Sequence, residues 1–165
     1  MITWQFSTSD DISSYVVRFG TRSDWSHVDT VLPDGNLLGA LPLDGVQIRP
    51  PDYANFTSSL RVSLDIGCDE VFYELLKSQI GKPYDWWAVV AFAVGDRDWQ
   101  TEDNWFCSEL QVWAVIKCGF FKAPLLIPTD RISPRDQLLL FSPWFVLDHD
   151  NDTIPHNSTF RLSTI

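Results

Sequence analysis

Short apolar runs alternate with turn-forming residues over residues 1–66. Within this part, residues 60–66 alternate apolar and polar side chains with a period of two, which is typical of a strand with one solvated face. The pair Asp34-Gly35 separates two apolar runs, as the turn of a β-hairpin does. The pattern predicts strands at residues 16–19, 28–32, 37–41, 46–49 and 60–66.

A helical pattern replaces the strand pattern after residue 68. Over residues 69–80 the apolar side chains recur at the spacing of one helix face. Asp69 and Glu70 lie at the expected N-terminus, where the helix dipole favours acidic side chains, and Gly81 lies at the expected end. The spacing therefore predicts an amphipathic helix over residues 69–80.

Three later segments are apolar and one is polar. Residues 86–94 are apolar on every side, which predicts a buried helix, but they are fewer than the roughly 20 residues of a membrane-spanning helix. Residues 108–117 predict another apolar helix, and residues 138–141 resemble a strand. Residues 148–165 are polar and weakly patterned, so we expect one domain over 1–147 and a polar tail outside its core.

Composition and charge narrow the classes of function. Of the 165 residues, 45% are hydrophobic and 21% are charged, which provides enough apolar surface for one folded core. The 22 acidic residues against 12 Lys and Arg give a net charge of −10, which repels nucleic acid phosphates and argues against nucleic acid as a partner. The N-terminus lacks the basic and apolar regions of a signal peptide, so we expect a cytoplasmic or phage-associated protein without a transmembrane segment.

The cysteines are the first candidates for chemistry. Cys68, Cys107 and Cys118 are odd in number and form no CxxC pair, which argues against a disulfide framework and against a zinc ribbon. We therefore expect reduced thiols, and neither a metal nor another cofactor.

Cys107 lies at the junction between a loop and the predicted helix 108–117. Unpaired backbone N–H groups and the positive end of the helix dipole favour a thiolate there, so they lower the pKa of a thiol, and the same N–H groups can stabilise an oxyanion. The alternative is that Cys107 is a small buried hydrophobic residue, as most free cysteines are. Glu109 would point about 200° away from Cys107 on the helix, which suits a helix-terminal charge or a buried ion-pair partner better than a catalytic base.

A cysteine nucleophile needs a base, and His27 is the best placed of the three histidines. It precedes the predicted strand 28–32, where a rigid backbone can orient an imidazole, whereas His149 and His156 lie in the polar tail. The alternative is a structural histidine that bonds a neighbouring hydroxyl or carboxylate at a strand edge.

Three short motifs carry a resemblance to a known family. WSHV at residues 25–28, GKPYD at 81–85 and FCSEL at 106–110 resemble, in this order, motifs of the YiiX-like, circularly permuted papain-fold amidases and peptidases. In that permuted group the histidine precedes the cysteine, as it does here. The resemblance implies an α+β, permuted papain-like (NlpC-type) fold, in which an antiparallel sheet packs against helices.

The resemblance also implies roles for single residues. Cys107 would be the nucleophile, His27 the general base and later the acid, and Tyr84 a residue near the pocket wall. Trp25 and Trp105 flank the expected base and nucleophile in the sequence, which makes them candidates for the walls of a substrate pocket.

The third catalytic residue is where the chain departs from the family. The family usually has a polar residue on the strand that follows the histidine strand, and this chain has Gly39 there. Asp29 shares the strand face of His27 and Asp44 lies in the next loop, so either carboxylate could orient the imidazole, or the site has no third residue.

These roles imply a thiol hydrolase that cleaves an amide, of the peptide or cell-wall type, or an ester through an acyl-enzyme on Cys107. Fold analogy does not choose among a cell-wall peptide, another small amide and an acyl lipid as substrate. The alternatives are a catalytically weakened ligand-binding domain, which Gly39 suggests, a lipid acyltransferase, and a structural component of a phage or secretion assembly.

Overall fold

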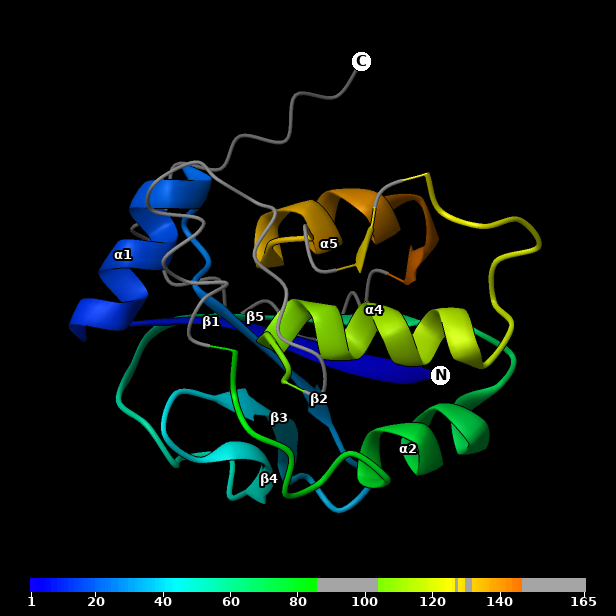
Figure 1. Ribbon diagram of the computed structural model, residues 1–165, viewed down its shortest axis with the longest axis horizontal. Helices are drawn as coiled ribbons and strands as arrows, with labels where there is room; N and C mark the ends of the chain where they lie inside the picture. The colour runs from blue at the N-terminus through cyan, green and yellow to red at the C-terminus, as the bar shows by residue number, and fades with distance from the viewer. Residues whose placement is uncertain (86–103, 127, 130–131, 147–165) are drawn as a thin grey trace.

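The computed structural model describes residues 1–85, 104–126, 128–129 and 132–146, which form an α+β protein around one antiparallel sheet (Figure 1). The six strands lie in the order β4-β3-β2-β1-β5-β6. Their bounds are β1 Ile2–Ser9, β2 His27–Val31, β3 Leu37–Leu41, β4 Gly45–Arg49, β5 Phe56–Leu64 and β6 Phe145–Val146. The predicted α+β class is confirmed, whereas the predicted helix 86–94 and the polar tail 148–165 lie outside the described residues.

Most of the predicted strands are present. β2 and β3 form the hairpin predicted around Asp34-Gly35, with Thr30 opposite Leu38, and Gly35 adopts a φ of +87° in its turn. β4 and β5 match the predicted strands at 46–49 and 60–66. β1 was not predicted, although apolar and polar residues alternate along it, and it pairs with both β2 and β5 near the middle of the sheet.

The predicted strand at 16–19 is wrong, because these residues belong to helix α1, Ile12–Thr21. The side chain of Asp11 accepts a hydrogen bond from the backbone N–H of Ser14 at 2.8 Å and so caps the first turn. Val17 is buried on the inner face of this helix. The N-cap and the burial of one helix face outweigh the strand preference of the adjacent valines.

The strand-like segment 138–141 is also helical. It lies in α5, Pro134–Phe141, which Ser133 caps in reciprocal hydrogen bonds with Asp136. Proline at the first helical position further favours a helix start, because its missing N–H would have no partner there. Period alone cannot separate a short apolar helix segment from a strand, and here the capping residues decide.

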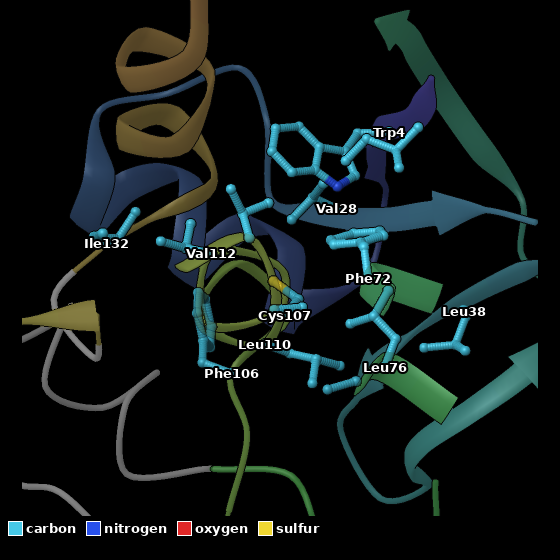
Figure 2. Packing of buried hydrophobic residues seen from close by; sticks show 14 of the residues in the cluster. Trp4, Val28, Leu38, Phe72, Leu76, Phe106, Cys107, Leu110, Val112 and Ile132 are labelled. Carbon is cyan, nitrogen blue, oxygen red and sulfur yellow. The ribbon is translucent and has the colours of Figure 1, made fainter. Parts of the chain in front are cut away.

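Two further helices complete the layer over the sheet. The predicted helices at 69–80 and 108–117 are confirmed as α2, Asp69–Lys77, and α4, Cys107–Lys117. Figure 1 shows α4 lying across the sheet, with α2 and α5 on either side of it. The core fills the space between sheet and helices, with Trp4, Val28, Phe72 and Leu110 among its buried side chains (Figure 2). None of the described helices has the length and apolar character needed to cross a membrane.

The expectation of reduced thiols is wrong for two of the three cysteines. Cys68, just before α2, forms a disulfide with Cys118, just after α4, with their Cα atoms 6.0 Å apart. These cysteines meet because α2 and α4 pack against each other, which a count of cysteines cannot reveal. Cys107 is the remaining free cysteine.

Candidate active site

His27 and Asp29 lie on the same face of β2, because side chains two residues apart in a strand point the same way. The imidazole Nε2 of His27 and the carboxylate Oδ1 of Asp29 are 2.9 Å apart, which is the distance of a hydrogen bond. The Asp29 side chain is 1% exposed and that of His27 is 12% exposed. A buried carboxylate therefore fixes the orientation of the imidazole and leaves its other nitrogen, Nδ1, for a second partner.

Cys107 approaches His27 from α4. It is the first residue of that helix, and its thiol lies within the core between the helix layer and the sheet (Figure 2). The charge of Cys107 is among the causes that raise the pKa of His27, which requires the two side chains to lie near each other. The predicted nucleophile and base are thus brought together from residues 80 positions apart in the sequence.

The charge of His27 follows from these neighbours. Burial lowers the pKa of His27, while the charges of Asp29 and Cys107 and the hydrogen bonds to both raise it, and the result is a pKa of about 10 against an ordinary value of 6.5. His27 is therefore an imidazolium at neutral pH. Its positive charge, together with the N-terminus of α4, stabilises negative charge on the sulfur of Cys107.

The structure selects Asp29 over Asp44 as the partner of His27. The side chain of Asp44 is 59% exposed and lies 4.0 Å from the guanidinium of Arg49. Gly39 marks the space that Asp29 occupies: a Cβ atom at position 39 would lie 2.0 Å from Oδ1 of Asp29. Glycine at this position is thus compatible with an oriented imidazole, because the carboxylate of Asp29 fills the place of a side chain on β3.

Tyr53 is a contact of the site that the sequence did not reveal. It lies in the turn between β4 and β5, and its hydroxyl donates a hydrogen bond to Oδ2 of Asp29 at 2.9 Å. The segment PPDY at residues 50–53 predicts only a turn, and nothing local in it indicates that the turn folds back against β2. Tyr53 comes near Asp29 through the strand order of the sheet, which was not predicted from the sequence.

The second motif, at residues 81–85, reaches the site along the edge of β4. Gly81 donates to the carbonyl of Val46, and the N–H of Val46 donates to the carbonyl of Lys82, both at 2.9 Å. Tyr84 then pairs with Trp105 in a parallel bridge. The pKa of the buried Tyr84 is raised well above its ordinary value by burial first and then by the charge of Cys107, and its ring centroid lies 5.9 Å from that of Phe106, the residue before Cys107.

The two tryptophans predicted as pocket walls are both partly buried and pack against the core. The indole N–H of Trp105 donates to the side chain of Gln79 at 3.2 Å, and its ring centroid lies 5.0 Å from that of Trp113. Trp25 lies two residues before His27, and its backbone N–H donates to the hydroxyl of Ser23 at 2.9 Å. Their predicted contact with a substrate stays a prediction.

Glu109 has the role expected of a helix-terminal charge. It is buried, and its carboxylate accepts a hydrogen bond from the backbone N–H of Phe106 at 3.4 Å, next to Cys107. This contact forms part of the cap of α4 and thereby helps to fix where the helix begins.

Comparison with known proteins identifies the fold. No family model matches the sequence, and no curated protein matches it. Among solved structures, the metalloprotein YiiX from Escherichia coli O157:H7 superimposes with a TM-score of 0.56 at 19% sequence identity, over 73% of this chain and 66% of that one. The protein has a YiiX-like fold. The chain spans just under two thirds of the length of YiiX, and at this level of identity the likeness concerns the fold alone. The YiiX-like fold is the part of the predicted resemblance that is confirmed.

Proposed function

We propose that the protein is a thiol hydrolase in which Cys107 attacks the carbonyl carbon of an amide or ester. The observation that supports this most is the chain of contacts from Asp29 to His27 to Cys107, assembled from β2 and α4. A nucleophile, a base and a group that orients the base are the parts that covalent acyl transfer requires. We further propose that the arrangement is a permuted papain-like (NlpC-type) one, in which the histidine strand precedes the cysteine helix.

The reaction proceeds in two halves. In the first, the sulfur of Cys107 forms a bond to the carbonyl carbon, His27 gives its proton to the leaving amine or alkoxide, and the bond to that leaving group breaks. In the second, His27 takes a proton from a water molecule whose oxygen attacks the acyl carbon, and the carboxylic acid leaves as Cys107 recovers its negative charge. Backbone N–H groups in the first turn of α4 lack helical partners and can stabilise the oxyanion.

The raised pKa of His27 suits this sequence of steps. With a pKa of about 10, His27 holds its proton at neutral pH and can give it to the leaving group. The carboxylate of Asp29 stabilises the imidazolium and keeps the Nε2 proton directed toward itself.

One observation favours a second candidate, a ligand-binding domain without turnover. The thiol of Cys107 is fully buried, whereas reactive cysteines are usually at least partly exposed. A substrate therefore reaches the sulfur only if the neighbouring side chains move. The rate at which a small reagent modifies Cys107 separates the two candidates, because a hydrolase must allow this opening during each turnover.

A metal does not fit the described part of the site. YiiX is named a metalloprotein. In the described residues of this chain, no group of three or more His, Cys, Asp or Glu side chains is placed to hold a metal ion.

The test is alkylation of Cys107 by iodoacetamide as a function of pH, with the modified residue identified by mass spectrometry. We expect Cys107 to react faster than an ordinary buried thiol, and this excess reactivity to be lost in His27→Ala. His149→Ala is the matched histidine control and should behave like the wild type. The variant Cys68→Ser/Cys118→Ser leaves Cys107 as the sole thiol and verifies the assignment.

Turnover is then measured with an activated ester and a small peptide amide. We expect the wild type to release product and Cys107→Ala to release none, because the acyl group has no other sulfur to bind at the site. An acyl-enzyme that forms but hydrolyses slowly, and is released by an added alcohol or amine acceptor, would indicate an acyltransferase. A Cys107 that no reagent modifies in the native protein would overturn the hydrolase and support the binding domain.

A further inference from the structure

The carboxylate of Asp29 is bonded at both of its oxygens by different parts of the chain. Oδ1 lies 2.9 Å from Nε2 of His27, and Oδ2 accepts a hydrogen bond from the hydroxyl of Tyr53, also at 2.9 Å. Asp29 is completely buried, so an oxygen without a partner would carry a large cost. The bond from Tyr53 therefore fixes the rotation of the carboxylate that presents Oδ1 to the imidazole.

The backbone of β3 leaves room for this rotation at Gly39. A Cβ atom at Gly39 would lie 2.0 Å from Oδ1 and 3.1 Å from the carboxylate carbon of Asp29. Both distances are shorter than a normal van der Waals contact, so any side chain at position 39 would displace the carboxylate.

Arg49 connects Tyr53 to the backbone of Gly39. The guanidinium of this buried arginine donates to the carbonyl of Gly39 at 3.2 Å and to that of Gly45 at 3.1 Å. Its carbon Cζ also lies 5.5 Å from the centre of the Tyr53 ring, within the range of a cation–π contact. Arg49 thus contacts both the ring of Tyr53, whose hydroxyl donates to Asp29, and the backbone of Gly39, which makes room for Asp29.

We propose that Tyr53 is a positioning residue of the site, which acts on His27 by holding the carboxylate of Asp29 in the rotation that Gly39 allows. This inference rests on the proposed function for its significance, but the contact itself can be tested without any substrate. Tyr53 takes no part in bond making or breaking.

The charges around the site agree with a donor role for Tyr53. Burial first, and then the negative charge of Asp29, raise the pKa of Tyr53 far above its ordinary value, and the charge of Arg49 opposes this only in part. Tyr53 therefore stays protonated, and remains a donor, throughout the pH range in which the protein would be studied. The groups that act on the charge of His27 itself are Asp29 on its own strand and Cys107 on α4.

The experiment compares Tyr53→Phe with the wild type by NMR titration of the His27 ring. Loss of the hydroxyl frees the carboxylate to rotate away from Nε2, so the pKa of His27 should fall by about one unit or more. At about pH 6 His27 stays protonated in both proteins, so the titration midpoint is the quantity that separates them. Gly39→Ala should lower the pKa of His27 further, because it displaces the carboxylate directly.

Tyr73→Phe is the matched control. Tyr73 is also partly buried, and its pKa is raised by burial first and then by the carboxylate of Asp69 on α2. This variant should leave the titration of His27 unchanged. An unchanged or raised pKa of His27 in Tyr53→Phe would overturn the positioning role. If instead the wild type hydrolyses no substrate but the titration shifts as expected, the proposed function fails and the positioning role stands.

Discussion

The proton on His27 links the site to the stability of the molecule. In the folded protein the pKa of His27 is about 10, and in the unfolded chain it returns to the ordinary value of 6.5. The folded state therefore binds this proton more tightly, so the stabilisation is fully present below pH 6.5 and is lost as the pH rises through about 10.

We expect the difference in free energy of unfolding between the wild type and His27→Gln to shrink as the pH rises from about 6.5 to 10. The change amounts to about 1.4 kcal/mol for each pKa unit by which the folded and unfolded states differ. Urea unfolding at several pH values measures it. Two parallel stability curves across this range would show that the pKa of His27 is not raised in solution.

At the same scale, the sequence predicts the proposed nucleophile, base and orienting carboxylate better than the residues that support them. Cys107 follows from its place at a helix start, and Asp29 from sharing a strand face with His27. Tyr53 and Gly39 support Asp29 from other segments of the chain, and only the pairing of β2 with β3 and the path of the turn after β4 bring them near. Local patterns carry no information on such contacts.

At the scale of secondary structure elements, Gln111 holds α4 against the sheet. It lies one turn after Cys107, is fully buried, and its amide accepts a hydrogen bond from Thr30 on β2 and donates one to the carbonyl of Leu38 on β3 at 3.2 Å. The same two strands carry His27 and Gly39. The bonds of Gln111 therefore tie α4, which begins at Cys107, to the two strands that carry His27 and Gly39.

Replacement by leucine tests this contact, since leucine has a similar volume but no polar atoms. We expect Gln111→Leu to lower the free energy of unfolding by about 1 to 3 kcal/mol, because it leaves the Thr30 hydroxyl and the Leu38 carbonyl buried without partners. Alkylation of Cys107 should slow as well. Urea unfolding and labelling rates provide the two measurements.

Gln137 on α5 offers the matched control. It is also fully buried, but neither polar atom of its amide has a hydrogen-bond partner within the described part of the chain. Gln137→Leu should therefore be neutral or stabilising, because it removes polar atoms whose burial is uncompensated. Equal destabilisation by both variants would mean that the bonds of Gln111 contribute nothing specific.

The elements that the sequence misassigns share one cause. In α1 and α5, β-branched or leucine-rich runs resemble strands over four residues, and the capping residues Asp11 and Ser133 lie outside those short windows. Both N-caps are visible in the sequence, and a wider window that starts from them would have indicated helices. By contrast, α2 has its acidic first turn and its full apolar period in one segment, and it was predicted correctly.

At the scale of the whole molecule, the disulfide between Cys68 and Cys118 joins the two helices that the sequence treats separately. It links residues 50 positions apart. By lowering the entropy of the unfolded chain, such a link raises the free energy of unfolding by about 4 kcal/mol in the chain-entropy description, and about 2 to 4 kcal/mol is typical of measured disulfides. Disulfides persist mainly in oxidising compartments, so this bond argues against the expected cytoplasmic location.

We expect protein unfolded without reductant to show one reactive thiol per chain, that of Cys107, and three after reduction. Reduction and the variant Cys68→Ser/Cys118→Ser should each lower the free energy of unfolding by about 2 to 4 kcal/mol. The two treatments should agree, because both act on the same bond. Three thiols without reductant, in protein exposed to air, would restore the prediction of a fully reduced chain. The position of α4, and with it that of Cys107, would then depend on packing and on buried hydrogen bonds such as those of Gln111 and Ser108.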